Sequence, residues 1–248
     1  MATIAYGCRY ITVAKEMQAE KLALCGIDTS RFGNDVDPGL LALLAPAEPA
    51  RMAVDLAGFV ATSQTLRLEE PIKLDQELAL TGRLDQHQDA SGCSMLSTIN
   101  LANGNGHRLF SAEAALFRRN PKAPRGPGRT ASSSSPTGRI LAQARFTPEA
   151  VAQYSDRQGN PIHFDQPAAE RAGFRAPIAG GTHALHYLTA AAWLQLSERP
   201  IALEVAFLRP IFWDDCCDVV ADLQGDGSFD LVRDGKSLVS IRIKRASN

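Results

Sequence analysis

The sequence predicts an α+β fold, in which antiparallel sheets wrap around a central helix and the chain divides into two similar halves. Three observations lead to this expectation. Residues 118–138 are rich in proline, glycine and serine and interrupt the hydrophobic pattern near the middle of the chain. A strand pattern that ends in Pro-Ile occurs once on each side of this stretch. Residues 182–196 form an apolar segment without a charged residue, which is typical of a buried helix.

The composition is that of an ordinary globular protein. Of the 248 residues, 45% are hydrophobic and 21% are charged, which provides enough apolar material for one large core or two smaller ones. The net charge of −1 gives no general attraction for nucleic acid or for an anionic membrane. Residues 1–19 lack the apolar core of a signal peptide, and no uncharged apolar run approaches the ~18 residues of a membrane span. We therefore expect a cytoplasmic protein that binds neither nucleic acid nor membrane.

The cysteines indicate a reducing compartment. There are 5 of them, an odd number, and none has the C-x-x-C spacing of many zinc and redox sites. Scattered cysteines of this kind are typical of free thiols in a cytoplasm. They are Cys8, Cys25, Cys93, Cys216 and Cys217.

The central stretch, residues 118–138, is predicted to be a flexible linker between a first domain, residues 1–117, and a second, residues 139–248. Residues 66–75 can be aligned with residues 205–214. In both segments alternating apolar residues predict a half-buried strand, Pro-Ile then interrupts pairing, and an Asp precedes a second alternating run. Because the pattern occurs in both halves, we interpret the chain as an internal duplication.

Further strands and helices complete this prediction. Each half should end in an antiparallel hairpin, since turn sequences separate alternating runs at residues 95–101 and 109–117, and at residues 231–232 and 238–244. A long apolar helix followed by such strands favours a sheet wrapped around that helix. A shorter helix should begin at Thr147, a good N-cap followed by Pro and Glu, and end near Ser155.

A polar loop that contains glycine and proline follows this shorter helix and carries His163 next to a phenylalanine. Loops of this composition often hold functional groups. Residues 159–165 read Gly-Asn-Pro-Ile-His-Phe-Asp, and residues 173–181 read Gly-Phe-Arg-Ala-Pro-Ile-Ala-Gly-Gly. Together they strongly resemble the MaoC-like (R)-specific enoyl-thioester hydratase and 3-hydroxyacyl-thioester dehydratase family, whose motifs are S-G-D-x-N-P-[LIV]-H-x-D and F-x-x-P-I-[AV]-H-G. The resemblance covers residues 145–244, and in the first half only the strand pattern is shared.

The resemblance implies a double hot-dog fold: two antiparallel sheets, each wrapped on a central helix, joined side by side. It also implies a hydro-lyase that adds or removes water at the 2,3-position of an acyl thioester, which enters a tunnel beside the central helix. Acyl-CoA or an acyl-carrier protein would be the partner, and no metal or other cofactor is needed. The first half would be a degenerate hot dog that covers the tunnel. One chain then resembles a dimer of simpler members, and a further homodimer is left open.

The resemblance assigns roles to residues of the loop. His163 matches the catalytic histidine, and Asn160 matches the motif asparagine, which we expect to hold the turn. Gln158 stands where the family has its catalytic Asp, and it cannot exchange a proton near neutral pH. Either His163 acts alone with Gln158 positioning the water, which we favour, or Asp156 supplies the carboxylate from two residues away.

The start of the central helix is the second predicted part of the site. Gly181 matches the family's glycine there, and Gly180 replaces the family's histidine. Both glycines permit close approach, and unpaired N–H groups at a helix start would stabilise a developing enolate. We also expect Thr182 and His183 to bind substrate, and His183 lacks the partners of a metal ligand.

The sequence is also compatible with two other functions. A thioesterase on the same fold would direct the water at the thioester carbonyl, although the Asn-Pro-Ile-His loop favours the hydratase. A non-catalytic protein that binds acyl thioesters is the other, and Gln158 is the observation that supports it.

Overall fold

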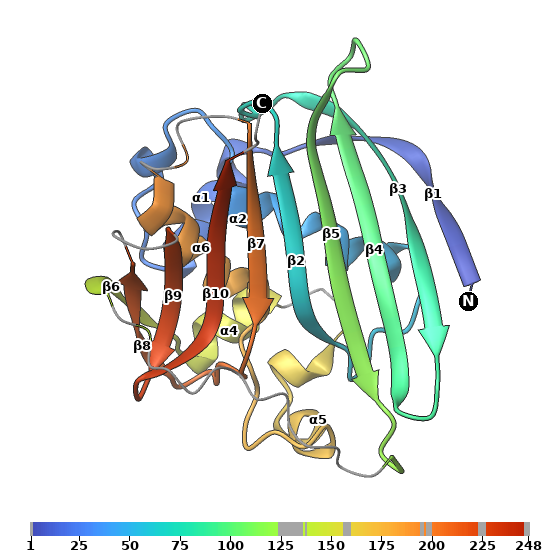
Figure 1. Ribbon diagram of the computed structural model, residues 1–248, viewed down its shortest axis with the longest axis vertical. Coiled ribbons are helices and arrows are strands. Elements are labelled where there is room, and N and C mark those ends of the chain that lie inside the picture. The colour runs from blue at the N-terminus through green and yellow to red at the C-terminus, as the bar shows by residue number, and fades with distance from the viewer. Residues whose placement is uncertain are drawn as a thin grey trace.

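A computed structural model of the chain describes residues 2–123, 136, 138–155, 160–193, 196, 200–222 and 227–245. In these residues ten antiparallel strands form one continuous sheet, in the order β1-β3-β4-β5-β2-β7-β10-β9-β8-β6. Figure 1 shows the strands side by side, with α1, α2, α4 and α6 behind the sheet and α5 near one end of it. The α+β prediction is therefore confirmed.

Both halves build their part of the sheet from five strands. The first half contains β1 (Ala2–Thr12), α1 (Lys15–Leu24), η1 (Thr29–Phe32), α2 (Pro38–Leu41), α3 (Leu44–Arg51), β2 (Val60–Leu68), β3 (Glu77–Gln88), β4 (Gly92–Ala102) and β5 (Arg108–Arg119). The second half contains β6 (Arg139–Arg145), α4 (Pro148–Ser155), η2 (Pro161–His163), α5 (Gln166–Arg171), α6 (Gly181–Ala192), β7 (Ile201–Phe207), β8 (Cys216–Ala221), β9 (Ser228–Arg233) and β10 (Lys236–Arg245). Counted outward from the centre, β2, β5, β4, β3 and β1 correspond to β7, β10, β9, β8 and β6.

The internal repeat predicted from the Pro-Ile pattern is present in the structure. β2 and β7 pair with each other at the centre of the sheet. After each of these strands a Pro interrupts the ladder, because it has no N–H to donate. The carbonyl of the next residue then accepts a hydrogen bond from the segment that leads into a helix. Val36 N donates to Ile72 O at 2.8 Å, and Ala179 N donates to Ile211 O at 2.8 Å.

The two predicted helices of the second half are present, although α6 ends at Ala192 and not at residue 196. α6 begins at Gly181 and ends at Ala192, and it lies against β6, β8, β9 and β10 and against α2. α4 begins as expected, since Thr147 Oγ1 accepts a hydrogen bond from Ala150 N at 3.2 Å. Within the described ranges no helix is long and apolar enough to cross a membrane.

Several elements of the first half were not predicted. β1 pairs only with β3, at the edge of the sheet, and most of its residues are exposed or partly exposed, so it has no clear alternation. The helical segment that corresponds to α6 is divided into α2 and α3, and Pro49 lies inside α3, which obscures the helical pattern. β5 continues to Arg119, two residues into the predicted linker, and residues 124–135 and 137 of that linker lie outside the described part of the chain.

A buried hydrogen-bond network joins the helices of the two halves. Asp37, the N-cap of α2, is 0% exposed and lies against α6. Its carboxylate accepts hydrogen bonds from His186 Nδ1 at 2.5 Å, from Thr189 Oγ1 at 2.7 Å and from Gly39 N at 2.9 Å. Burial raises the pKa of Tyr154 well above its ordinary value, so its hydroxyl keeps its proton and donates to His186 Nε2 at 2.7 Å.

Close packing accompanies this network. A Cβ added to Gly39 would lie 3.1 Å from the backbone N and the Nδ1 of His186 and 3.1 Å from Thr189 Oγ1. A larger residue there would push α2 away from α6. The network and the glycine together fix how closely the two helices approach.

Replacing Asp37 with Ala should lower the free energy of unfolding by about 3–5 kcal/mol, because the change removes one partner of a buried pair and leaves its donors unpaired. Urea denaturation measures this loss. Asp28→Ala is the matched control, since Asp28 also caps a helix through Ser30 N but is exposed, and it should cost only about 1 kcal/mol. Equal losses in the two variants would contradict the role assigned to the network.

Candidate active site between the two halves

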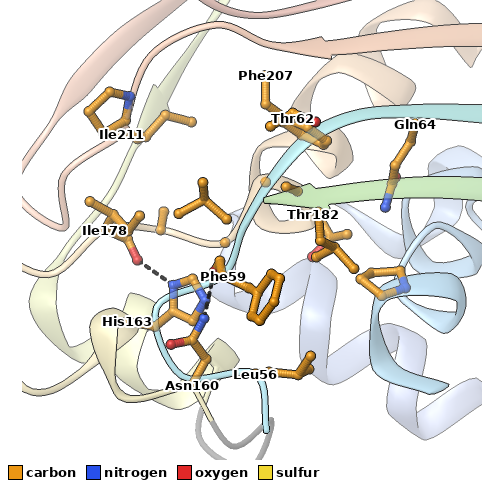
Figure 2. Close-up of a pocket in the computed structure, with 18 of the residues that line it drawn as sticks. Leu56, Phe59, Thr62, Gln64, Asn160, His163, Ile178, Thr182, Phe207 and Ile211 are labelled. Atoms are coloured by element: carbon orange, nitrogen blue, oxygen red, sulfur yellow. Dashed lines mark hydrogen bonds between the residues drawn. The ribbon is translucent and has the colours of Figure 1, made fainter. Parts of the chain in front are cut away.

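A cavity of about 500 Å³ lies between the central strands of the sheet, α3 and the start of α6. Most of its wall is apolar, with Pro46, Ala47 and Ala50 from α3 and Phe207 from β7. A few polar side chains interrupt this wall. They are Arg51, Thr62, Gln64, Asn160, His163, Thr182 and Arg209. Figure 2 shows that side chains from both halves surround the cavity.

His163 is held on the cavity wall by a backbone hydrogen bond. It ends η2, and its Nδ1 donates to Ile178 O at 2.8 Å (Figure 2). With the proton on Nδ1, the neutral ring carries its lone pair on Nε2. Burial lowers the pKa of His163, because the imidazolium would lose hydration. The ring is therefore neutral near pH 7 and can accept a proton at Nε2.

The loop that carries His163 is fixed at both ends. Asn160 is 7% exposed, and its Nδ2 donates to Phe59 O of the first half at 2.9 Å. Asp165 caps α5 by accepting from Ala168 N at 2.6 Å. Because Asn160 uses its NH₂ group on Phe59, the carbonyl oxygen Oδ1 is left as an acceptor, and no described residue donates to it.

The start of α6 lies beside the histidine. A Cβ added to Gly180 would lie 4.0 Å from His163 Cε1, so the ring packs close to the backbone there. A Cβ added to Gly181 would lie 2.3 Å from Phe207 Cε1, which requires glycine at this position. The N–H groups of Gly181 and Thr182 are in the first turn, where the helix has no carbonyl to accept from them. They can stabilise negative charge that develops in the cavity.

The comparisons with known proteins identify the fold. No family model matches the chain, and no curated protein matches it. HtdX from Mycobacterium tuberculosis has a TM-score of 0.76 at 17% identity, over 99% of this chain and 100% of that one. A MaoC-like dehydratase from Phytophthora capsici has a TM-score of 0.69 at 16% identity, over 98% and 95%. Another M. tuberculosis protein, described as having a double hotdog fold, has a TM-score of 0.59 at 12% identity, over 98% and 94%.

This chain has the double hot-dog fold. Its two hot dogs form a pseudo-dimer within one polypeptide. The same fold also carries other activities, since an acyl-ACP thioesterase from Bacteroides thetaiotaomicron has a TM-score of 0.57 at 11% identity, over 96% of this chain and 97% of that one.

The double hot-dog structure brings most of the predicted site residues together. His163, Asn160, Gly180, Gly181 and Thr182 all line the cavity. Gln158 and Asp156 lie outside the described residues. In the described part of the chain no group of three or more His, Cys, Asp or Glu side chains could hold a metal ion, and the five cysteines are free thiols.

The expectation that His183 contacts the substrate is wrong, because its side chain is 0% exposed and does not line the cavity. One residue after Thr182, the helix has turned by about 100°, so the ring points into the protein. It stacks on Tyr154 at 4.3 Å between ring centroids and meets the edge of Phe146 at 5.1 Å. Neither ring nitrogen has a hydrogen-bond partner among the described residues.

The sequence did not reveal that the first hot dog forms so much of the cavity wall. α3 was not predicted, and Gln64 lies between Ser63 and Thr65 in a stretch without apolar alternation. In the first half, residues 25–37 occupy the place of the loop that carries His163, and they contain no histidine. The first half therefore contributes wall residues but no counterpart of His163.

His183 should make the protein less stable in acid. Burial lowers its pKa to about 3, whereas an unfolded histidine titrates near 6.5. Between these values the unfolded state binds the extra proton, so the free energy of unfolding falls as the pH falls, by up to ~1.4 kcal/mol per pH unit. His183→Phe keeps an aromatic ring against Tyr154. It should remove the uptake of about one proton on unfolding, so the free energy of unfolding should depend less steeply on pH. Urea denaturation at a series of pH values measures it, and identical slopes in wild type and variant would contradict the assignment.

Proposed function

We propose that this double hot-dog protein is a hydro-lyase that adds water to, or removes it from, the 2,3-position of an acyl thioester. The observation that carries the proposal is a neutral histidine, with Nε2 free to accept a proton, beside a helix start in a largely apolar cavity. The substrate would be carried by CoA or an acyl-carrier protein. The reaction needs no metal or further cofactor, and free thiols fit the cytoplasm as its location.

In the hydration direction, His163 Nε2 accepts a proton from water while the water oxygen forms a bond to C3 of a 2-enoyl thioester. The electron pair of the double bond moves toward the thioester carbonyl, which becomes an enolate oxygen. The N–H groups of Gly181 and Thr182 stabilise that oxygen, and one such donor is typically worth ~3 kcal/mol. The imidazolium then returns the proton to C2. Dehydration follows the same steps in reverse.

Asn160 positions the loop that carries His163, because its Nδ2 donates to Phe59 O at 2.9 Å. No Asp or Glu lines the described part of the cavity. This supports a mechanism in which His163 is the only one of these side chains that exchanges a proton.

A thioesterase is the second candidate, because a solved acyl-ACP thioesterase shares the fold. In that reaction the water held by His163 would attack the thioester carbonyl, and the carrier thiol would leave. The structural similarity to a MaoC-like dehydratase and the Asn-Pro-Ile-His sequence favour attack at C3 instead.

His163→Ala should lower the turnover of 2-enoyl-CoA by about 10²–10⁴-fold, the usual contribution of a positioned acid or base. The loss of enoyl absorbance measures turnover, and circular dichroism checks that the variant is folded. A folded variant with full activity would show that another residue is the base. A variant that fails to fold would show that His163 is structural.

The role of residue 158 can be separated from that of residue 156. If His163 acts alone, Gln158→Asp should keep or raise hydration, because it restores a carboxylate that can accept a proton, and Asp156→Asn should do little. If Asp156 is the base, Asp156→Asn should cost about as much as the loss of His163. Steady-state kinetics of both variants on the best substrate distinguish the two. Insensitivity to both, with tight acyl-CoA binding and no product, would favour a binding protein.

A further inference from the structure

A second hollow, of about 730 Å³, lies beside the candidate active site and is not used by the proposed chemistry. Its walls come from the end of β5, the turn between β3 and β4, η2 and α5. Figure 1 shows the end of β5 and α5 at the same end of the sheet. Both hot dogs therefore contribute to this hollow, as they do to the active-site cavity.

The two hollows share a partition that is one layer of chain thick. In residues 56–60, 160–163 and 173–174, some side chains line the active-site cavity and their neighbours in the sequence line the second hollow. Phe59 belongs to the active-site wall, and the guanidinium of Arg118, which lines the second hollow, lies 4.5 Å from the centroid of its ring. A ligand group in the second hollow would therefore be close to the loop that carries His163.

The second hollow is positively charged. Arg118, Arg119 and Arg171 line it, and Asp89 is the only acidic residue among the described residues of its wall. Asp89 Oδ1 already accepts hydrogen bonds from Ser91 N at 2.8 Å and from Ser91 Oγ at 2.6 Å, and these bonds lower the pKa of the carboxyl. The excess of arginines favours an anionic ligand.

Two of the arginines can reach a ligand from solvent-exposed positions. The side chain of Arg171 is 74% exposed, and its Nη2 lies 4.0 Å from Asp165 Oδ1, at the limit of an ion pair. Arg119 is also exposed, and its Nη2 donates to Ala123 O at 2.8 Å. A guanidinium carries several N–H donors in a planar fork that matches the oxygens of a phosphate, so both side chains keep donors for such a group.

We propose that this hollow binds the phosphorylated adenosine end of coenzyme A, with Arg119 and Arg171 donating to its phosphates, so that CoA and not an acyl-carrier protein carries the acyl group. The inference rests on the proposed function, since it assumes a thioester beside His163. The thioester and the nucleotide lie at opposite ends of the pantetheine arm, which would cross the edge of the partition. A concave hollow admits a nucleotide, whereas a folded carrier protein has no such group to insert.

Binding of saturated thioesters tests the inference without requiring any reaction. Isothermal titration should compare butyryl-CoA, its 3′-dephospho form and butyryl-pantetheine, which carry the same acyl group with all, fewer and none of the phosphates. Butyryl-CoA should bind about tenfold more tightly than butyryl-pantetheine, with the dephospho form between them, because each phosphate adds charge-assisted hydrogen bonds. Adenosine 3′,5′-bisphosphate should compete with butyryl-CoA. Equal affinity for all of these thioesters would overturn the proposal.

Variants assign the phosphate contacts to the second hollow. Arg119→Gln and Arg171→Gln should each weaken butyryl-CoA binding by about three- to fivefold, and together by about tenfold, while butyryl-pantetheine binds as before. Arg171→Lys keeps the charge without the fork and should cost less than Arg171→Gln. Arg67→Gln is the matched control, because Arg67 is an exposed residue of β2 that lines neither hollow. An equal loss in Arg67→Gln would overturn the assignment.

A carrier protein tests the choice of carrier. Butyryl-acyl-carrier protein should bind more weakly than butyryl-CoA, and Arg119→Gln and Arg171→Gln should not change its affinity by more than about twofold. Tighter binding of the carrier protein than of butyryl-CoA would overturn the proposal.

The outcomes separate this inference from the proposed function. Phosphate-dependent binding of butyryl-CoA that is lost in the two glutamine variants, in a protein that hydrates no enoyl-CoA, would sustain the inference and contradict the hydro-lyase. Hydration of enoyl-CoA with a KM that neither variant changes would sustain the hydro-lyase and overturn the inference.

Discussion

A buried carboxylate at the start of α2 sets the distance between the helices of the two hot dogs. Asp37 can be buried because three donors surround it, and an unpaired charge in this position would be strongly destabilising. α3 follows α2 directly and forms one wall of the cavity, while the first turn of α6 forms another. The shape of the cavity therefore depends on how α2 packs on α6.

Hydrogen bonds between buried groups also position His163. His163 is oriented by the carbonyl of Ile178, and its loop is tied to the first hot dog by Asn160, which donates to Phe59 O. The proposed base and part of the cavity wall thus belong to different halves, and a direct hydrogen bond from Asn160 to Phe59 O joins them. The first hot dog therefore supplies part of the candidate site and also covers it.

Sequence reasoning succeeded where a pattern was periodic or a motif was local. The strands after each Pro-Ile, the N-cap of α4 and the buried helix α6 all follow from such patterns. It did not predict β1 and β6, which lie at the edges of the sheet. Most of their residues are exposed, so the sequence shows no clear alternation of apolar and polar residues there. It also placed His183 in the pocket, because a helix that is apolar almost all round does not show which side faces the cavity.

The distant part of the cavity could not be predicted at all. Gln64 is flanked by polar residues, and only the pairing of β2 with β5 and β7 shows that its side chain faces inward. A Gln on a strand is ordinarily a surface residue. Its burial, with one hydrogen bond made and one acceptor free, is visible only in three dimensions.

The proposed reaction directs water at C3 of an enoyl thioester and not at its carbonyl. Mass spectrometry of a panel of 2-enoyl-CoAs incubated with the protein distinguishes these two sites of attack. We expect a product that has gained the mass of one water and still carries its CoA. Release of free CoA from the enoyl substrate, or a panel that is bound but unchanged, would contradict it.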